Sequence, residues 1–284
     1  MKIIYWNIGK GLSDKKCAFI GNLIYSENPD IFCIAEGTNS KTSCEKLSIL
    51  FSKYSYISYY EPRFTDESSY KLNYKFNRNG LKVFFKNNIT LEDKFAFHLQ
   101  REEGRIIIMN LFINYNPTSI IFLHNFSKSG GRDVNDTQKS FLSQLNTALK
   151  FKNLGESSSR NIIIGDFNVE PWDNILRQNR YLETSFFKKQ NDLHQRNSNI
   201  LFNPTLNFIQ SSKIDNLVGT YYSNSYGWAL FDYALYNSKK FDLEYEIITK
   251  LDKRVSLLNV DNKLIANFLY HNLDHLPIKI KIVR

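Results

Sequence analysis

Short runs of apolar residues recur along the chain, and most have the length and the β-branched or aromatic content of strands. They predict strands over residues 2–7, 30–35, 54–60, 80–85, 105–114, 119–124, 161–165, 229–236, 241–248 and 277–283. In the last of these, Ile278, Ile280 and Ile282 alternate with lysines, which is the pattern of a half-buried strand. Strands therefore dominate the predicted fold.

Apolar residues at helical spacing predict a smaller number of helices between the strands. The first runs from a cap at Ser13 to about Asn28, where Pro29 ends it. The others are predicted over 43–53, over 172–181, and along the apolar face formed by Phe141, Leu142, Leu145 and Leu149. Helices interspersed among strands indicate an α/β protein.

Several strands follow one another after only a short turn, which favours antiparallel pairing. The strands over 105–114 and 119–124, for instance, are predicted to turn at Asn116-Pro117. The pattern thus favours layers of sheet and helix over a purely parallel, doubly wound fold. Surface loops or irregular structure are predicted for the polar segments 61–79, 127–136 and 186–212.

The composition supports one large core, because 42% of the 284 residues are hydrophobic and the chain contains 22 Phe and 17 Tyr. No Pro-rich or Ser/Gly-rich run divides the chain, so we expect a single domain over residues 1–284. The apolar run at the start is too short for a signal peptide, and no run approaches the ~20 apolar residues of a membrane span. Three cysteines without metal spacing fit a reduced, cytoplasmic protein.

The formal net charge is +9, from 37 Lys and Arg against 28 Asp and Glu. An excess of this sign favours a polyanionic partner, either nucleic acid or an anionic membrane surface. The basic residues are spread along the chain and form no single block, which weakens the inference from charge alone. Nothing in the sequence indicates a protein partner.

The strand over 161–165 ends in Gly165, Asp166, Phe167 and Asn168, which is the most informative stretch of the chain. Because side chains alternate along an extended chain, Asp166 and Asn168 point to the same side. A carboxylate and an amide at the mouth of a buried strand suit a hydrolytic site that handles a phosphate and a metal. Gly, Asp and Asn are also common turn residues, so a plain turn explains this stretch equally well by itself.

The same arrangement recurs at other predicted strand ends, where a polar residue of catalytic type lies beside an apolar run. These residues are Asn7, Glu36, His124, Asp166 with Asn168, Asp232, and the pair Asp274-His275. Taken singly, most have a simple structural explanation, such as a turn for Asn7 or a satisfied core histidine for His124. Asp232 is harder to explain, because an acid flanked by Phe231 and Tyr233 is costly to bury without a partner. Together the residues predict one shared pocket at an edge of the sheets.

In this order, the motifs resemble the signature of the endonuclease/exonuclease/phosphatase superfamily, which includes DNase I-like nucleases, neutral sphingomyelinases and inositol polyphosphate 5-phosphatases. The matches over 165–168 and 274–277 are the specific ones, and the resemblance extends from residue 5 to residue 282. It implies a four-layer α/β sandwich, in which two packed and mostly antiparallel sheets are flanked by helices. It also implies a metal-dependent hydrolase of phosphoric esters.

The resemblance further implies which residues hold a metal. Glu36, helped by Asn7 and Asp274, would bind a divalent cation, and these hard oxygen ligands suit Mg²⁺, with Mn²⁺ as an alternative. The cation would offset the charge that develops on a phosphate oxygen while water attacks phosphorus in line.

The other residues would act on the water and on the phosphate. Asp232 would fix the tautomer of His275, and the two would form an acid–base or phosphate-stabilising dyad. Asp166 would orient or deprotonate the attacking water, and Asn168 would hydrogen-bond the phosphate. His124 would face the leaving-group side, as general acid or phosphate ligand. Whether Asp166 or His275 is the base stays open.

Some positions depart from the superfamily's pattern. Ala35 stands where Gln is common before the glutamate, and Leu273 stands where Ser is common before the last Asp-His pair. Thr38 replaces an Arg with which DNase I-like members contact the DNA groove, which weakens a double-stranded DNA interpretation. His124 replaces the Tyr of apurinic endonucleases, so a role in base excision is disfavoured.

We predict a nuclease acting on DNA or RNA, because the net charge is positive and two segments, 59–75 and 187–196, combine aromatic with basic residues. The alternative is a phosphatase or phosphodiesterase acting on a small-molecule or lipid phosphate, which would use the same residues with a different rim. A third hypothesis is a non-catalytic nucleic-acid-binding module, which the complete set of catalytic-type residues disfavours.

Overall fold

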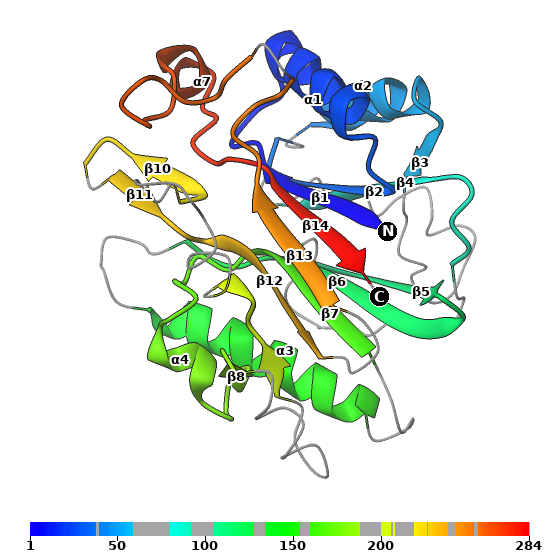
Figure 1. Cartoon of the computed structure of the whole chain (residues 1–284), viewed down its shortest axis with the longest axis vertical. Coiled ribbons are helices and arrows are strands. Elements are labelled where there is room, and N and C mark those ends of the chain that lie inside the picture. Colours follow the sequence, from blue (N-terminus) through cyan, green and yellow to red (C-terminus); the bar gives the residue numbers. More distant parts are fainter. Residues whose placement is uncertain are drawn as a thin grey trace.

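The structure, a computed structural model, describes most of the chain (Figure 1). The described residues are 1–37, 40–58, 80–91, 105–127, 134–153, 160–187, 200–205, 207, 219–225, 227–237, 242–252 and 255–283. Several predicted features lie outside them. These are Thr38, the loop over 61–79, most of the segments 127–136 and 186–212, the aromatic and basic segment 59–75, and all of the segment 187–196 except Phe187.

One six-stranded sheet brings together the beginning and the end of the chain. In spatial order its strands are β13 (Asp242–Ile247), β14 (Ile278–Val283), β1 (Lys2–Asn7), β2 (Ile31–Ala35), β4 (Leu81–Lys86) and β3 (Tyr56–Ser58). Strands β1 and β2 run parallel, and the other neighbouring pairs are antiparallel.

The middle of the chain forms a second six-stranded sheet. In spatial order its strands are β5 (Ile106–Ile113), β6 (Asn116–His124), β7 (Arg160–Asp166), β12 (Asp232–Asn237), β9 (Leu201–Phe202) and β8 (Thr184–Ser185). The pairs β6–β7 and β8–β9 are parallel, and the others are antiparallel. A separate hairpin, β10 (Tyr221–Ser223) with β11 (Gly227–Ala229), precedes β12.

Helices cover the outer faces of both sheets (Figure 1). Helices α1 (Asp14–Glu27) and α2 (Lys41–Ser52) lie on the first sheet, and α3 (Asp136–Asn153) and α4 (Asn174–Arg177) lie on the second. A short helix, α7 (Ala266–Tyr270), precedes β14, and α4 is shorter than the helix predicted over 172–181. The four layers confirm the predicted fold class, an α/β sandwich with mostly antiparallel sheets. None of the helices described is both long and apolar enough to cross a membrane.

The ends of α1 agree with the sequence prediction. Ser13 is the N-cap, and its hydroxyl accepts a hydrogen bond from the N–H of Lys16 at 3.2 Å. At the other end Asn28 adopts the left-handed conformation, with φ 46°, and Pro29 follows it. The helix therefore begins and ends where local side chains satisfy its backbone.

The inner faces of the two sheets pack together and form the core. Every residue of β2 and of β7 is buried, because helices cover one face of each strand and the facing sheet covers the other. Buried tyrosines cross this interface: the Tyr5 hydroxyl donates to Leu123 O at 3.2 Å. The Tyr245 hydroxyl likewise donates to Asp232 O at 2.7 Å. This packing places the polar strand ends of the two sheets side by side.

The turn between β5 and β6 lies two residues earlier than the sequence predicts. It is formed by Asn114 and Tyr115, whose φ values are both positive, 51° and 63°. Two such residues match the twist of a tight hairpin. The prediction at Asn116-Pro117 is therefore wrong, and both residues belong to β6. Pairing with β7 starts at Thr118, so the missing N–H of Pro117 breaks no bond to that strand.

A tertiary contact divides one predicted strand. The prediction of a single strand over 229–236 is wrong, because β11 and β12 are separate strands joined by Leu230 and Phe231. The Thr220 hydroxyl accepts hydrogen bonds from the N–H groups of Phe231 and Asp232 at 3.0 and 2.8 Å. It replaces a strand partner there, and the backbone changes course before β12 begins.

Candidate active site

Three of the predicted site residues lie side by side at strand ends on one side of the second sheet. His124 ends β6, Asp166 ends β7, and Asp232 begins β12. The register pairs His124 with Asp166, and Asp166 with Asp232. They lie together because the parallel strands β6 and β7 end at the side of the sheet where the antiparallel strand β12 starts. All three side chains are buried.

The first sheet brings four more predicted residues to the matching edge. Asn7 ends β1, and Glu36 directly follows the parallel strand β2. Asp274 and His275 lie just before β14. Because β14 runs antiparallel to β1, its start lies at the end of β1.

Side-chain contacts join the two edges into one cluster. The Asn7 Nδ2 atom donates to Asp166 Oδ2 at 3.1 Å and lies 3.5 Å from Glu36 Oε1. The His124 Nε2 atom lies 3.5 Å from the same Glu36 oxygen and 3.8 Å from Asp166 Oδ2. Asn7 and Glu36 belong to the first sheet, whereas His124 and Asp166 belong to the second. Residues far apart in the sequence therefore meet at this cluster.

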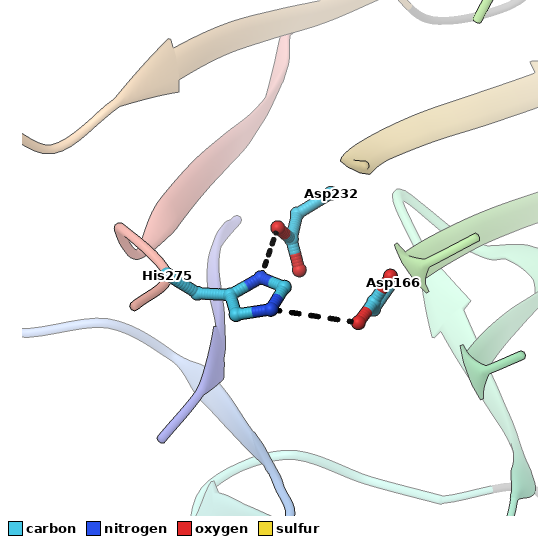
Figure 2. Close-up of side chains that lie close together, drawn as sticks. All are labelled: Asp166, Asp232 and His275. Carbon is cyan, nitrogen blue, oxygen red and sulfur yellow. Dashed lines mark hydrogen bonds and ion pairs between the residues drawn. The ribbon is translucent and has the colours of Figure 1, made fainter. Parts of the chain in front are cut away.

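Asp232 and His275 form a buried pair inside the cluster (Figure 2). The His275 Nδ1 atom lies 2.8 Å from Asp232 Oδ2, a distance typical of a charge-assisted hydrogen bond. The other ring nitrogen, Nε2, faces Asp166 and lies 3.9 Å from its Oδ2 atom. The ring of Tyr221 packs against the imidazole with 4.9 Å between the ring centroids. Asp232 thus fixes the ring orientation and leaves Nε2 directed at the cluster.

Burial and neighbouring charges shift the pKa of two of these groups. Burial and the charge of Asp232 raise the pKa of Asp166 from 3.8 to about 6, although His275 and His124 oppose this. Burial alone would lower the pKa of His275, but the carboxylates around it, Asp232 above all, raise it from 6.5 to about 10. At neutral pH the cluster therefore holds an imidazolium beside a carboxylate that binds protons more strongly than usual.

Asn168 shapes the turn that holds Asp166. Its φ is 50°, and its backbone N–H donates to Asp166 Oδ1 at 2.8 Å. Its side-chain Nδ2 donates to Asn125 O at 3.1 Å. The position of Asn168 beside the cluster is thus explained by backbone contacts, and its action as a phosphate ligand stays a prediction.

Two buried amides, Asn125 and Gln138, support this turn, and the sequence pattern does not single them out. The Asn125 Nδ2 atom donates to Phe167 O at 2.9 Å, and the Gln138 Nε2 atom donates to Asn168 O at 3.0 Å. Asn125 directly follows His124, so its place at a strand end is a signal that could have found it. Gln138 lies in the first turn of α3 and carries no such local signal.

Glu36 is held in an uncommon backbone conformation. Its φ is 60°, and that of Gly37 is 69°. A residue other than glycine seldom adopts the left-handed region, and such strain persists where the surroundings fix it. A Cβ on Gly37 would lie 2.4 Å from Ile8 Cδ1, so any other residue there would displace the Ile8 side chain and adopt a strained, positive φ. The Glu36 side chain, 18% exposed, is thereby kept at the rim of the cluster.

The oxygen donors at this rim fit a hard divalent cation. Glu36 and Asp274 offer carboxylates, and the charges of both act on buried Lys16, which places them in the same region. The Asn7 amide oxygen accepts one hydrogen bond, from Gly9 N at 3.0 Å. A carbonyl oxygen has two lone pairs, so one remains for a cation. The donor set therefore suits Mg²⁺ or Mn²⁺.

A second grouping of potential ligand atoms lies deeper. One atom each from Asp166, Asp232 and His275 lies within 4.8 Å of the other two. A cation bound there would compete with the hydrogen bond between His275 and Asp232, which disfavours this grouping as the cation site. The Asp232 Oδ1 atom is buried without a hydrogen-bond partner in the described part of the chain.

No protein-family model and no curated protein match the sequence. Solved structures do match, and each of the following covers 100% of this chain. The human Nocturnin catalytic domain with bound sulfate anion has 16% identity, 94% of its own chain covered and a TM-score of 0.58. D. rerio TDP2 complexed with single strand DNA product has 12% identity, 99% coverage and a TM-score of 0.61. The mannosyl-6-phosphatase of Bacteroides thetaiotaomicron has 14% identity, 100% coverage and a TM-score of 0.59.

The chain has the endonuclease/exonuclease/phosphatase fold. This finding confirms the architecture that the motifs implied. At 12% to 16% identity the likeness establishes the fold, and one fold hosts many activities, so the chemistry has to be argued from the side chains of the site.

Proposed function

We propose that this protein is a divalent-cation-dependent hydrolase of phosphoric esters, and that its substrate is DNA or RNA. One observation carries the proposal. The Asp232–His275 pair directs a ring nitrogen at Asp166, which lies at the junction of the two sheets beside Asn7. An aligned acid–histidine pair next to a second, buried acid is a recurring arrangement in hydrolytic sites.

The geometry suggests how the two acids and the histidine share the work. Asp166 accepts hydrogen bonds and offers no donor when ionised, so we assign it to the attacking water, which it orients and deprotonates. His275, tied to Asp232 through Nδ1, would donate from Nε2 to a phosphate oxygen. His124 lies on the opposite side of Asp166 in the sheet register and would face the leaving group.

The cation would be held by Glu36, Asn7 and Asp274. When bound, a divalent cation offsets the negative charge that grows on the phosphate oxygens during attack. The imidazole of His275, fixed by Asp232, would orient the phosphate for in-line displacement.

The choice of nucleic acid rests on charge. The net charge of +9 favours a polyanionic substrate over a small neutral one. Among the structures of like fold, D. rerio TDP2 is complexed with a single strand DNA product, which shows that the fold accommodates such a chain. A phosphatase acting on a small-molecule or lipid phosphate is the other outcome that a substrate test must distinguish.

The test is a substrate panel on purified protein. Plasmid, single-stranded DNA and RNA are incubated with Mg²⁺ or Mn²⁺, with and without chelator, beside a phosphodiester reporter and simple phosphate monoesters. We expect cation-dependent cleavage of nucleic acid, which His275→Ala and Asp166→Ala reduce by about 100-fold or more. Glu244→Gln, a change at an exposed ion pair on β13, is the matched control and should cleave normally.

Each contrary result has a distinct meaning. Cleavage of monoesters without cleavage of nucleic acid would reject the nuclease and favour the phosphatase. Nucleic-acid binding without hydrolysis of any substrate would favour a non-catalytic module. Activity that survives both alanine substitutions would remove the proposed site altogether.

A further inference from the structure

Lys16, in the first turn of α1, is a charged residue where the sequence predicts only a helix start. Its side chain is 2% exposed, although lysine is almost never fully buried unless it is paired. The charge of a buried ammonium costs several kcal/mol unless hydrogen bonds replace its hydration. The partners of Lys16 therefore need to be accounted for.

The ammonium of Lys16 binds the backbone of the loop that follows β1. Its Nζ atom donates to the carbonyl oxygens of Ile8, Lys10 and Gly11, the last two at 3.1 and 2.9 Å. These bonds use all three N–H donors of the ammonium. Lys16 therefore holds residues 8–11 together by hydrogen bonds and has no donor left for a substrate.

This loop contacts Asn7 and lies against the segments that carry the other two residues assigned to the cation. Gly9 N donates to Asn7 Oδ1 at 3.0 Å. A Cβ on Gly9 would lie 2.1 Å from Asn272 O and 3.7 Å from Asp274 Oδ1, so the loop lies directly against the segment that carries Asp274. Through Ile8 the loop also packs on Gly37, the residue after Glu36. One loop is thus in contact with three parts of the chain that are far apart in sequence.

The charge of Lys16 also acts on the residues assigned to the cation. Burial lowers the pKa of Lys16 to about 8, while the carboxylates of Asp274 and Glu36 act in the opposite direction. The ammonium therefore lies within electrostatic reach of both proposed ligands.

We propose that Lys16 is a positioning residue for the cation site. It anchors the 8–11 loop, and the loop holds Asn7, Glu36 and Asp274 in place before a cation binds. The inference rests on the proposed function, because it concerns the cation site named there. It adds a residue that touches neither the cation nor the substrate.

Two effects of removing the ammonium have opposite signs, which makes the proposal testable. A nearby positive charge repels a divalent cation, so charge alone predicts that its removal strengthens cation binding. Loss of the anchor releases the loop and leaves three carbonyl groups, that of Ile8 buried, without this donor, which predicts weaker binding. The proposal requires that the second effect exceeds the first.

The experiment is a calorimetric titration of Mn²⁺ into chelator-treated protein. We expect Lys16→Met to weaken binding by at least about tenfold, and the exposed neighbour Lys15→Met to change it less than about twofold. Phosphodiester hydrolysis by Lys16→Met should recover at saturating Mn²⁺, since its site is displaced and not destroyed. Unchanged or tighter Mn²⁺ binding by Lys16→Met would overturn the proposal.

A measurement on the wild-type protein covers the case in which Lys16→Met does not fold. The amides of Ile8 and Gly9, which donate to Ala35 O and Asn7 Oδ1, should already exchange slowly without a cation, because Lys16 holds the loop in this conformation. Fast exchange that slows only when Mn²⁺ is added would show that the cation orders the loop, and would reject the role of Lys16. If wild-type protein binds no divalent cation at all, the proposed cation-dependent function fails, which is a separate outcome.

Discussion

The substitution Asp232→Asn tests the charge relationship at the centre of the cluster. The Asp232 carboxylate lies 2.8 Å from His275 Nδ1 and is 1% exposed, so solvent screens the pair little. Asparagine keeps the shape of the side chain and a carbonyl oxygen that can accept a hydrogen bond from the Nδ1–H of His275. The change therefore removes the negative charge and leaves the packing almost intact.

The size of the effect follows from the distance between the charges. Two opposite charges about 4 Å apart attract by roughly 4 kcal/mol at an effective dielectric constant of about 20. Since about 1.4 kcal/mol corresponds to one pH unit, the pKa of His275 should fall by about three units, from about 10 toward about 7. Wild-type imidazole thus stays protonated at about pH 8, whereas the variant loses most of its charge there.

The assay is an NMR titration of the imidazole Cε1 protons in chelator-treated protein. The wild-type His275 signal should titrate at high pH, and the Asp232→Asn signal near neutrality. Glu244→Gln removes a charge from an exposed ion pair elsewhere and should leave the His275 pKa unchanged. If His275 titrates at the same pH in Asp232→Asn as in wild type, the reasoning about this pair is wrong.

Three further predictions concern stability and cation binding. Asp166→Asn should raise the free energy of unfolding, measured in urea at neutral pH, by about 1–2 kcal/mol. The shift in the pKa of Asp166 from 3.8 to about 6 corresponds to roughly 3 kcal/mol of destabilisation, and the lost hydrogen bond offsets about 1 kcal/mol of the gain. Because the pKa of Asp166 is raised in the folded protein, its carboxyl group loses its stabilising contribution as the pH rises through about 6. The extra stability of Asp166→Asn should therefore vanish below pH 3.8, and extra stability that persists there would contradict the argument. Gly165→Ala should destabilise the protein by more than about 3 kcal/mol, because the added Cβ would lie 1.9 Å from Leu123 O. Gly11→Ala, whose Cβ would meet no atom within 4 Å, should cost about 1–2 kcal/mol because of the positive φ of Gly11. Equal losses of stability in thermal unfolding would refute this prediction. Glu36→Gln should abolish the rise in Tm that Mn²⁺ causes in wild type while leaving the Tm without cation unchanged, and a full Mn²⁺ response in the variant would exclude Glu36 as a ligand.

The strands that position the cluster are readable from the sequence for a physical reason. A strand covered on both faces needs apolar residues at every position, and the isoleucines at 162–164 of β7 provide them. Asp166 then interrupts the apolar run at the end of the strand, where its charged group faces the cluster. The order of such interruptions is local information, and it identified the residues that converge.

What the sequence could not provide depends on contacts between distant segments. The break before β12 exists because Thr220 supplies a hydroxyl to Phe231 and Asp232, and no window around 229–236 contains that partner. Lys16 follows the N-cap of α1 and resembles any exposed helical lysine until the 8–11 loop closes over it. Asn125 and Gln138 likewise gain their roles only when β6, β7 and α3 are packed together.

Strand β14 bonds to both β13 and β1, and His275 precedes it. Translation runs from the N-terminus, so Asn7, Asp166 and Asp232 all leave the ribosome before the histidine does. A nascent chain at that stage carries acids with no imidazole between them, and β1 has no antiparallel partner on its open side. Completion of the pocket therefore waits until the residues before β14 have been synthesised, and a product terminated before residue 275 would contain the acids without the dyad.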